Sequence, residues 1–113
     1  MPMEKSGILL LYKPLGVRST SCVSLVKRLG GGRLKVGHAG TLDSTAEGLL
    51  AILVGKATRL SRYIMNFPKK YAVTVQFGIT TSTDDASGEI LERYALPSPD
   101  DLEARVDRIL PSF

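Results

Sequence analysis

The sequence contains few of the residues that build disulfides or metal sites. Its 113 residues include one cysteine, Cys22, one histidine, His38, and no tryptophan. A single cysteine cannot form an internal disulfide, and its place among serines in a predicted helix favours an inert thiol in a reducing compartment. No apolar run approaches the roughly 20 residues of a membrane-spanning helix, and the N-terminus lacks the pattern of a signal peptide. The sequence therefore predicts a cytoplasmic protein of at most one domain.

Several common cofactor and catalytic motifs are also missing. One histidine and one cysteine, without a C-x-x-C or H-x-x-x-H pair, do not predict a zinc site. Residues 55–58 are similar to the end of a phosphate-binding loop, but position 50 is leucine where that motif requires glycine. Neither G-x-G-x-x-G nor G-x-S-x-G is present. Asp84 and Asp85 are adjacent acids in a polar loop, where solvation is more common than metal binding. We therefore expect no metal and no cofactor.

Acidic residues are scarce in the first 70 positions. Residues 1–70 carry twelve Lys or Arg and three acids, a net charge of +9, whereas residues 71–113 carry three Arg and eight acids, a net charge of −5. This asymmetry suggests that one part of the protein meets a polyanion. Solvated surface charges are the alternative, and charge alone does not separate the two.

Hydrophobic periodicity predicts both strands and helices. Apolar runs or alternation predict strands at five places: 7–12, 34–36, 48–54, 69–78 and 89–94. Helical spacing of apolar residues predicts helices at three places: 19–29, 56–66 and 99–110. Ser19, Thr20 or Ser21 can cap the first helix, and the polar stretch 80–88 is expected to be a loop. This order of elements predicts an α/β or α+β domain with a mixed sheet.

Residues 37–43, with the sequence GHAGTLD, place a carboxylate at the end of a loop of small residues. Glycine lets such a backbone turn tightly and approach a ligand closely. The apolar run 48–54 follows almost at once, so Asp43 is expected beside buried structure, where a carboxylate is costly unless it has a function. Asp43 is therefore a candidate nucleophile or general base. Capping of a short helix at 44–47 is the alternative.

Two other residues are candidates for contact with a ligand. An isolated histidine is ordinarily a structural hydrogen-bonding residue, but the glycines around His38 predict that it is exposed. Tyr71 lies on the apolar side of the predicted strand and would ordinarily belong to the core. Lys69 and Lys70 directly precede its ring, and cations next to an aromatic suit a phosphate backbone and an unstacked base.

Taken together, five blocks form a more specific pattern than any of them alone. They are GILLLYKPLG at 7–16, GHAGTLD at 37–43, AEGLL at 46–50, GKAT at 55–58 and KY at 70–71. In order and spacing they resemble the TruB family of tRNA pseudouridine synthases. The resemblance implies an α+β pseudouridine synthase-like fold, with a mixed, largely antiparallel sheet flanked by helices, which this chain covers only in part. It also implies isomerisation of uridine to pseudouridine, in bacterial members at uridine 55 in the T-arm of tRNA, without cofactor or metal.

The resemblance also implies roles for individual residues. Asp43 matches the catalytic aspartate, whose carboxylate initiates cleavage of the N-glycosidic bond of the target uridine. Tyr71 matches the tyrosine that stacks on the flipped uracil, and His38 matches the histidine that helps to hold the disrupted T-loop. The basic stretch 56–66 fits the phosphate contacts that an RNA substrate requires. The implied partner is tRNA, with no membrane contact, and the complete protein is expected to be monomeric.

The chain departs from the family pattern in three ways. Ser44 stands where proline usually follows the catalytic aspartate, which predicts a less rigid loop, and Tyr12 stands where aspartate is common. Family catalytic domains continue well past Phe113, so residues 1–113 are expected to form the N-terminal half of such a domain, without the basic partner of Asp43 or an RNA-binding C-terminal domain. This half is expected to turn over poorly or not at all. A non-catalytic RNA-binding fragment of this fold and a guide-RNA-dependent relative that acts on ribosomal RNA are the alternatives.

Overall fold

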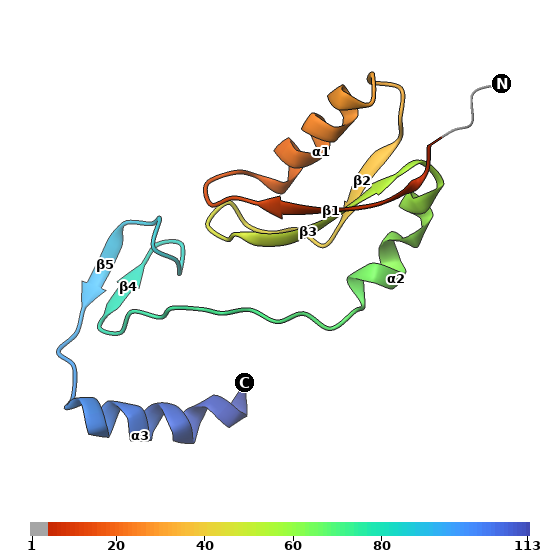
Figure 1. Ribbon diagram of the computed structural model, residues 1–113. Coiled ribbons are helices and arrows are strands. Elements are labelled where there is room, and N and C mark those ends of the chain that lie inside the picture. Colours follow the sequence, from red (N-terminus) through yellow and green to blue (C-terminus); the bar gives the residue numbers. More distant parts are fainter. Residues whose placement is uncertain (1–4) are drawn as a thin grey trace. The chain divides into compact units, whose positions relative to one another are not determined.

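The computed structural model describes residues 5–113, and the chain divides into two compact units between Lys70 and Tyr71 (Figure 1). The boundary coincides with the point where the net charge of the sequence changes from positive to negative. The first unit contains β1 (Gly7–Lys13), α1 (Ser19–Leu29), β2 (Val36–Ala39), β3 (Gly48–Val54), the 3-10 helix η1 (Gly55–Leu60) and α2 (Ser61–Met65). The second unit contains β4 (Ile79–Thr81), β5 (Ile90–Arg93), α3 (Pro99–Ile109) and the 3-10 helix η2 (Leu110–Ser112). Within residues 5–113, no helix is both long and apolar enough to span a bilayer.

The first unit is built on a three-stranded antiparallel sheet in the order β1-β3-β2. Lys13 at the end of β1 pairs with Gly48 at the start of β3, and Ala39 at the end of β2 pairs with Ala51. The β1–α1 turn and the β2–β3 connection, residues 40–47, therefore leave the sheet at the same end (Figure 1). This end is called the loop end below.

A small core joins α1 to the sheet. Its fully buried members come from α1, β2 and β3: Cys22, Val36, Leu50 and Ile52. Leu42 and Val17, which lie outside the regular elements, pack against this cluster and anchor the two connections at the loop end. Burial of one large aliphatic side chain contributes about 1.5–3 kcal/mol, so the core stabilises the loop end as well as the sheet. Cys22 is a free thiol, and the structure places it in the buried core.

Lys13 is a charged residue inside this unit, with a side chain that is 0% exposed. Its Nζ donates hydrogen bonds to the carbonyl oxygens of Pro14 at 3.0 Å and Val17 at 2.6 Å. A buried ammonium group is costly unless its protons are satisfied, and these two carbonyls satisfy two of them. Lys13 thereby fixes the turn between β1 and α1.

The second unit combines the β4–β5 hairpin with α3. In the hairpin loop, Asp85 Oδ1 accepts hydrogen bonds from the hydroxyls of Ser87 at 2.5 Å and Thr83 at 2.6 Å. These bonds hold the pKa of the Asp85 carboxyl below its usual value, because they stabilise the ionised form. α3 begins after Ser98, whose hydroxyl oxygen accepts from the backbone N–H of Asp101 at 3.3 Å, so the predicted helix at 99–110 is confirmed.

The α+β fold class is confirmed, and every strand pair among the described residues is antiparallel. Two predicted boundaries shift. The strand expected at 34–36 is β2, four residues that extend to Ala39 and include His38. The helix expected at 56–66 consists of η1 followed by the short α2.

The strand predicted at 69–78 is wrong for the described part of the chain. Residues 69–76 are assigned to no strand, and the side chains of Tyr71, Val73 and Val75 are exposed rather than half-buried. A strand requires a hydrogen-bonded neighbour, and none of the described residues supplies one here. β4 then begins at Ile79 and occupies the start of the predicted loop.

Candidate active site

Ser19 holds the β2–β3 connection in place from the start of α1. Its hydroxyl donates to the carbonyl oxygen of Leu42 at 2.7 Å and accepts from the N–H of Leu42 at 2.9 Å. The Ser19 residue is 2% exposed, so these bonds form in a site that is shielded from water. We call this pair of bonds the Ser19–Leu42 clamp. The prediction that Ser19 could cap α1 is wrong, because the N-cap position is Arg18 and no side-chain cap bond forms there.

Two backbone bonds fix the residues on the other side of Asp43. The N–H of Gly16 donates to the carbonyl oxygen of Ser44 at 2.7 Å, which ties the connection to the β1–α1 turn. The N–H of Ala46 donates to the carbonyl oxygen of Asp43 at 3.0 Å and closes a tight turn. The bond to Ser44 uses its carbonyl, so it does not depend on the side chain at that position. Asp43 therefore lies between two anchored neighbours.

The carboxylate of Asp43 is exposed and forms no ion pair with the other residues that the structure describes. Asp43 lies beside buried structure, as expected, because the partly buried Leu42 next to it packs against the core, but Asp43 itself is exposed. The helix-capping alternative is wrong, since residues 44–47 form a turn and not a helix. The carboxylate is thus held by its backbone and is free to meet a ligand.

Asp43 and His38 line one cavity of about 250 Å³, which opens at the loop end of the sheet. The other lining residues come from the start of α1 and from the β2–β3 connection: Arg18, Ser19, Thr20, Thr41, Leu42 and Ser44. This cavity brings together two of the three residues predicted from the sequence. It is smaller than the roughly 300–1,000 Å³ of a typical ligand pocket, so it can receive one small group rather than an extended ligand.

His38 occupies a strand rather than a loop. It lies on β2, pairs with Ile52 in the register of the sheet and is half-buried, so the predicted exposure holds only in part. Its Nδ1 is buried and has no hydrogen-bond partner among residues 5–113. A buried nitrogen without a hydrogen-bond partner costs free energy.

Tyr71 belongs to the second unit, where it is the first residue, and it does not line this cavity. The Tyr71 side chain is 65% exposed. It is therefore not a core residue of the described structure, as it would be on the apolar face of a strand. Its ring is therefore accessible for stacking, as the sequence suggested for a residue that follows two lysines.

Sequence reasoning missed Arg18, Ser19 and Thr20 as residues of the site. The serine and threonine were interpreted only as helix caps, and Arg18 contributed only to the charge count. No local pattern marks these residues, because their roles depend on Leu42 and Asp43, which lie more than 20 positions away. The cluster of hydroxyl residues at the start of a helix was the one available signal.

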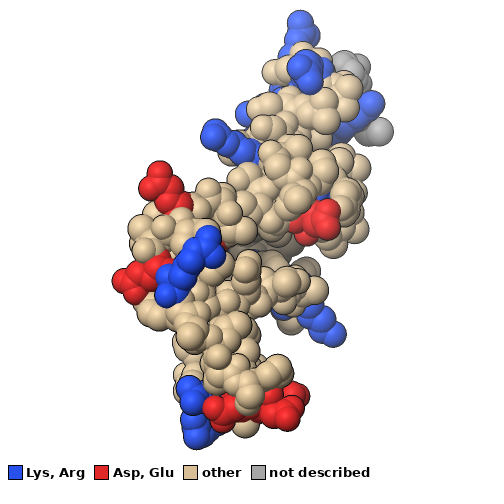
Figure 2. All heavy atoms as spheres, turned by 90° about the vertical axis from the view of Figure 1, so that its left-hand side faces the viewer, with Lys and Arg blue, Asp and Glu red and all other residues tan. Residues whose placement is uncertain are grey.

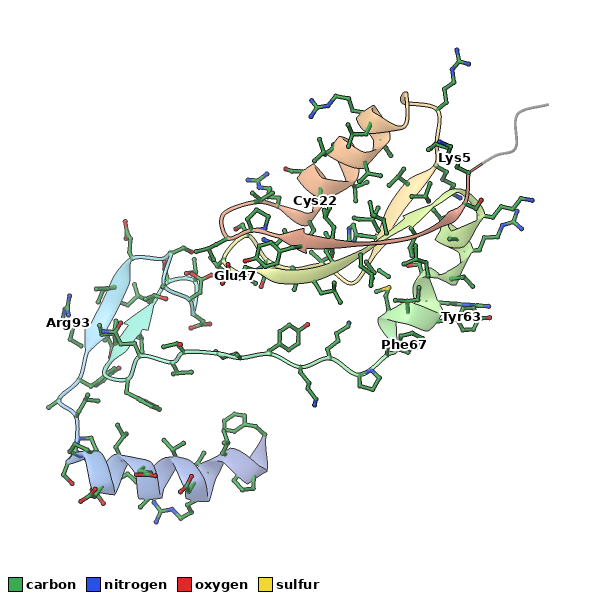
Figure 3. All side chains as sticks on the ribbon, in the orientation of Figure 1. Lys5, Cys22, Glu47, Tyr63, Phe67 and Arg93 are labelled. Carbon is green, nitrogen blue, oxygen red and sulfur yellow. The ribbon has the colours of Figure 1, made fainter. Side chains whose placement is uncertain are left out.

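Charge within the first unit is separated along the sheet. The acids among residues 5–70 are Asp43 and Glu47, both in the connection at the loop end, whereas Lys5 lies at the opposite end (Figure 3). Glu47 accepts a hydrogen bond of 2.6 Å from the hydroxyl of Tyr12, and this bond raises the pKa of Tyr12 above its usual value. Lys and Arg side chains predominate in the upper part of Figure 2.

A protein-family model described as "TruB family pseudouridylate synthase (N terminal domain)" matches residues 27–113. The chain belongs to the TruB family. Its TruB relatives include tRNA pseudouridine synthase B of Halalkalibacterium halodurans, which is 40% identical over 98% of this chain. The protein of the same name from Leifsonia xyli is 52% identical over 82% of the chain, and that from Aquifex aeolicus is 50% identical over 78%.

The match covers about a third of each relative: 36% of the Halalkalibacterium protein and 30% of each of the other two. The resemblance seen in the five sequence blocks is confirmed, since both the family model and these TruB relatives cover most of the chain.

Proposed function

We propose that this chain carries the catalytic carboxylate of an enzyme that isomerises uridine to pseudouridine in tRNA, at uridine 55 of the T-arm. The observation that carries the proposal is the Asp43 carboxylate, which is exposed, unpaired and held on an anchored turn in a cavity with His38. Membership of the TruB family supports the reaction, and the name tRNA pseudouridine synthase B of the relatives supports tRNA as the partner. The protein acts in the cytoplasm as a monomer.

The proposed chemistry begins with the target uridine outside the RNA stack. Unstacking costs a few kcal/mol, and a pocket that holds the flipped nucleotide offsets this cost. Asp43 at this cavity then initiates cleavage of the N-glycosidic bond, as a nucleophile or as a base. The base is then reattached through carbon. This sequence of steps requires neither metal nor cofactor.

His38 and Tyr71 are proposed to bind the substrate. His38 lines the cavity, and we infer that its side chain contacts the disrupted T-loop. The exposed ring of Tyr71 is available to stack on the flipped uracil. Base–aromatic stacking contributes about 1–3 kcal/mol per base.

We further propose that residues 1–113 correspond to the N-terminal half of a catalytic domain. Coverage of about a third of the relatives supports this, as does the absence of an ion pair at Asp43 in the described residues. The basic partner of Asp43 then comes from the region that these relatives possess beyond the matched part. The 113 residues alone are expected to give little or no single-turnover product, and robust turnover by them would contradict this part of the proposal.

A graft tests the catalytic role of Asp43. Residues 1–113 replace the matching segment of the Halalkalibacterium tRNA pseudouridine synthase B, which aligns with 98% of this chain. The grafted protein is incubated with tRNA, and pseudouridine is mapped by chemical modification. We expect product at uridine 55 from the graft and none from the graft that carries Asp43→Asn.

The matched control is Asp107→Asn, which removes the same charge from an exposed position on α3. It should leave the product yield unchanged, and circular dichroism should show the same fold for all three proteins. Equal product from the Asp43→Asn graft would refute a catalytic role for this residue. Equal tRNA binding without product from either form would instead favour an RNA-binding module of the same fold.

A further inference from the structure

Arg18 and Asp43 flank the Ser19–Leu42 clamp on its two chains. Arg18 directly precedes Ser19, and Asp43 directly follows Leu42, so the bonds of 2.7 and 2.9 Å between the clamp residues fix the two backbones side by side. The carbonyl oxygen of Arg18 also accepts the backbone N–H of Ser21 at 3.0 Å, which joins it to the first turn of α1. The position of Arg18 relative to Asp43 is therefore set by the fold and not by a flexible loop.

The side chains of Arg18 and Asp43 both line the cavity, yet they do not neutralise each other. Both residues are exposed, and neither forms an ion pair within 4.0 Å in the described part of the chain. The cavity thus presents one free cation and one free anion to a ligand, on the two sides of a rigid pair of hydrogen bonds.

We propose that Arg18 binds a phosphate that flanks the nucleotide on which Asp43 acts. This inference rests on the function proposed above and adds a substrate-binding residue to it. Arg18 lines the cavity of about 250 Å³ and is itself exposed, so its guanidinium can reach a phosphate at the rim of the cavity. The planar guanidinium presents paired N–H donors that match two phosphate oxygens. Arg18 therefore orients the nucleotide so that its glycosidic bond faces Asp43.

The test removes the charge from each partner separately and then from both. The probes are two RNA hairpins with the T-arm sequence, in which a methylphosphonate replaces the phosphate on the 5′ or on the 3′ side of the target uridine, and the unmodified hairpin. Dissociation constants are measured at fixed salt for the grafted protein described above, with Arg18 and with Arg18→Gln. Loss of a hydrogen bond between charged groups weakens binding about 10- to 100-fold.

We expect Arg18→Gln to weaken binding of the unmodified hairpin by about 10-fold or more. One of the two methylphosphonates should weaken hairpin binding by the protein with Arg18 by a similar factor. The same methylphosphonate should cause no additional loss of affinity in the Arg18→Gln protein. Arg18→Lys should recover part of the affinity, because it keeps the charge but loses the paired donors. The proposal would be overturned if Arg18→Gln left the affinity unchanged. It would also be overturned if the fold-loss from Arg18→Gln multiplied with the fold-loss from each of the two methylphosphonates, because the arginine and both phosphates would then act independently.

Arg28→Gln is the matched control, because Arg28 lies in the last turn of the same helix and does not line the cavity. If Arg28→Gln weakens hairpin binding, its fold-loss in affinity should multiply with the fold-loss from either methylphosphonate, because the two effects are independent. Failure of this inference is distinct from failure of the proposed function: the grafted protein would still form pseudouridine in an Asp43-dependent way. Absence of hairpin binding by the grafted protein that carries Arg18 would contradict both.

Discussion

Removal of the Ser19 hydroxyl tests whether the clamp positions the candidate site. Ser19→Ala leaves two backbone groups of Leu42, one N–H and one C=O, without their partner. An unsatisfied buried polar group costs about 1–3 kcal/mol. Leu42 is only partly buried, so water can reach part of this backbone. We therefore expect a loss of about 2–3 kcal/mol in the free energy of unfolding, a large part of the roughly 5–15 kcal/mol of a typical domain.

The measurement is urea unfolding followed by circular dichroism, with the free energy of unfolding obtained by linear extrapolation. Ser24→Ala is the matched control on the same helix: its exposed hydroxyl donates to the carbonyl oxygen of Thr20 at 3.0 Å, and its removal should change stability by no more than about 0.5 kcal/mol. Ser19→Ala should also lower single-turnover product formation in the graft about 100-fold, since a 1 Å misplacement near the chemistry can cost that much. Equal stability of the two variants, with full activity of Ser19→Ala, would refute the role of the clamp.

Three further predictions concern stability. Ile52→Ala, at a core position that is 0% exposed, should cost about 2–5 kcal/mol in urea unfolding. Gly55→Ala should destabilise the protein far more than Gly7→Ala. Gly55 has φ +62° and a Cβ added there would lie 2.4 Å from the Lys5 carbonyl oxygen, whereas a Cβ added at Gly7 would meet no described atom within 4 Å. Equal thermal midpoints of the two variants would contradict this. The lowered pKa of Asp85 adds stability that is present above the usual carboxyl pKa and is lost as pH falls through the folded value. NMR titration should show this low pKa, and Asp85→Asn should remove that part of the acid dependence.

The dense apolar patterns of this sequence determined much of the fold. The apolar runs at 7–12 and 48–54 became β1 and β3. β3 is central and largely buried, whereas β1 is an edge strand on which Ile8, Leu9 and Leu10 are exposed. The helix at 19–29 followed from apolar spacing, and the helix at 99–110 followed from Pro99, Asp100 and Asp101 in its first turn. Asp43 and His38 stood out from the small residues around them, and the structure places both in one cavity.

The remaining features depend on contacts that local patterns do not encode. Ser19 resembles a helix cap in sequence, but Leu42, which lies 23 positions away, takes its hydroxyl. The apolar neighbouring strand predicted that Asp43 lies beside buried structure, but not that Leu42 packs against the core while Asp43 itself is exposed. Alternation at 69–78 predicts which residues share a face, but a strand forms only where a neighbour is available to pair with it.

The unpaired stretch 69–77 has a consequence for hydrogen exchange. Among the described residues no backbone acceptor is assigned to its amides, so they should exchange nearly as fast as those of an unstructured peptide, whereas amides of the central strand β3 should exchange slowly. Successive N–H groups of an extended chain point to opposite sides, so pairing along one edge would protect every second amide, and pairing along both edges would protect them all. The protection pattern of these amides would thus reveal whether a neighbouring strand lies along one edge of this segment or along both.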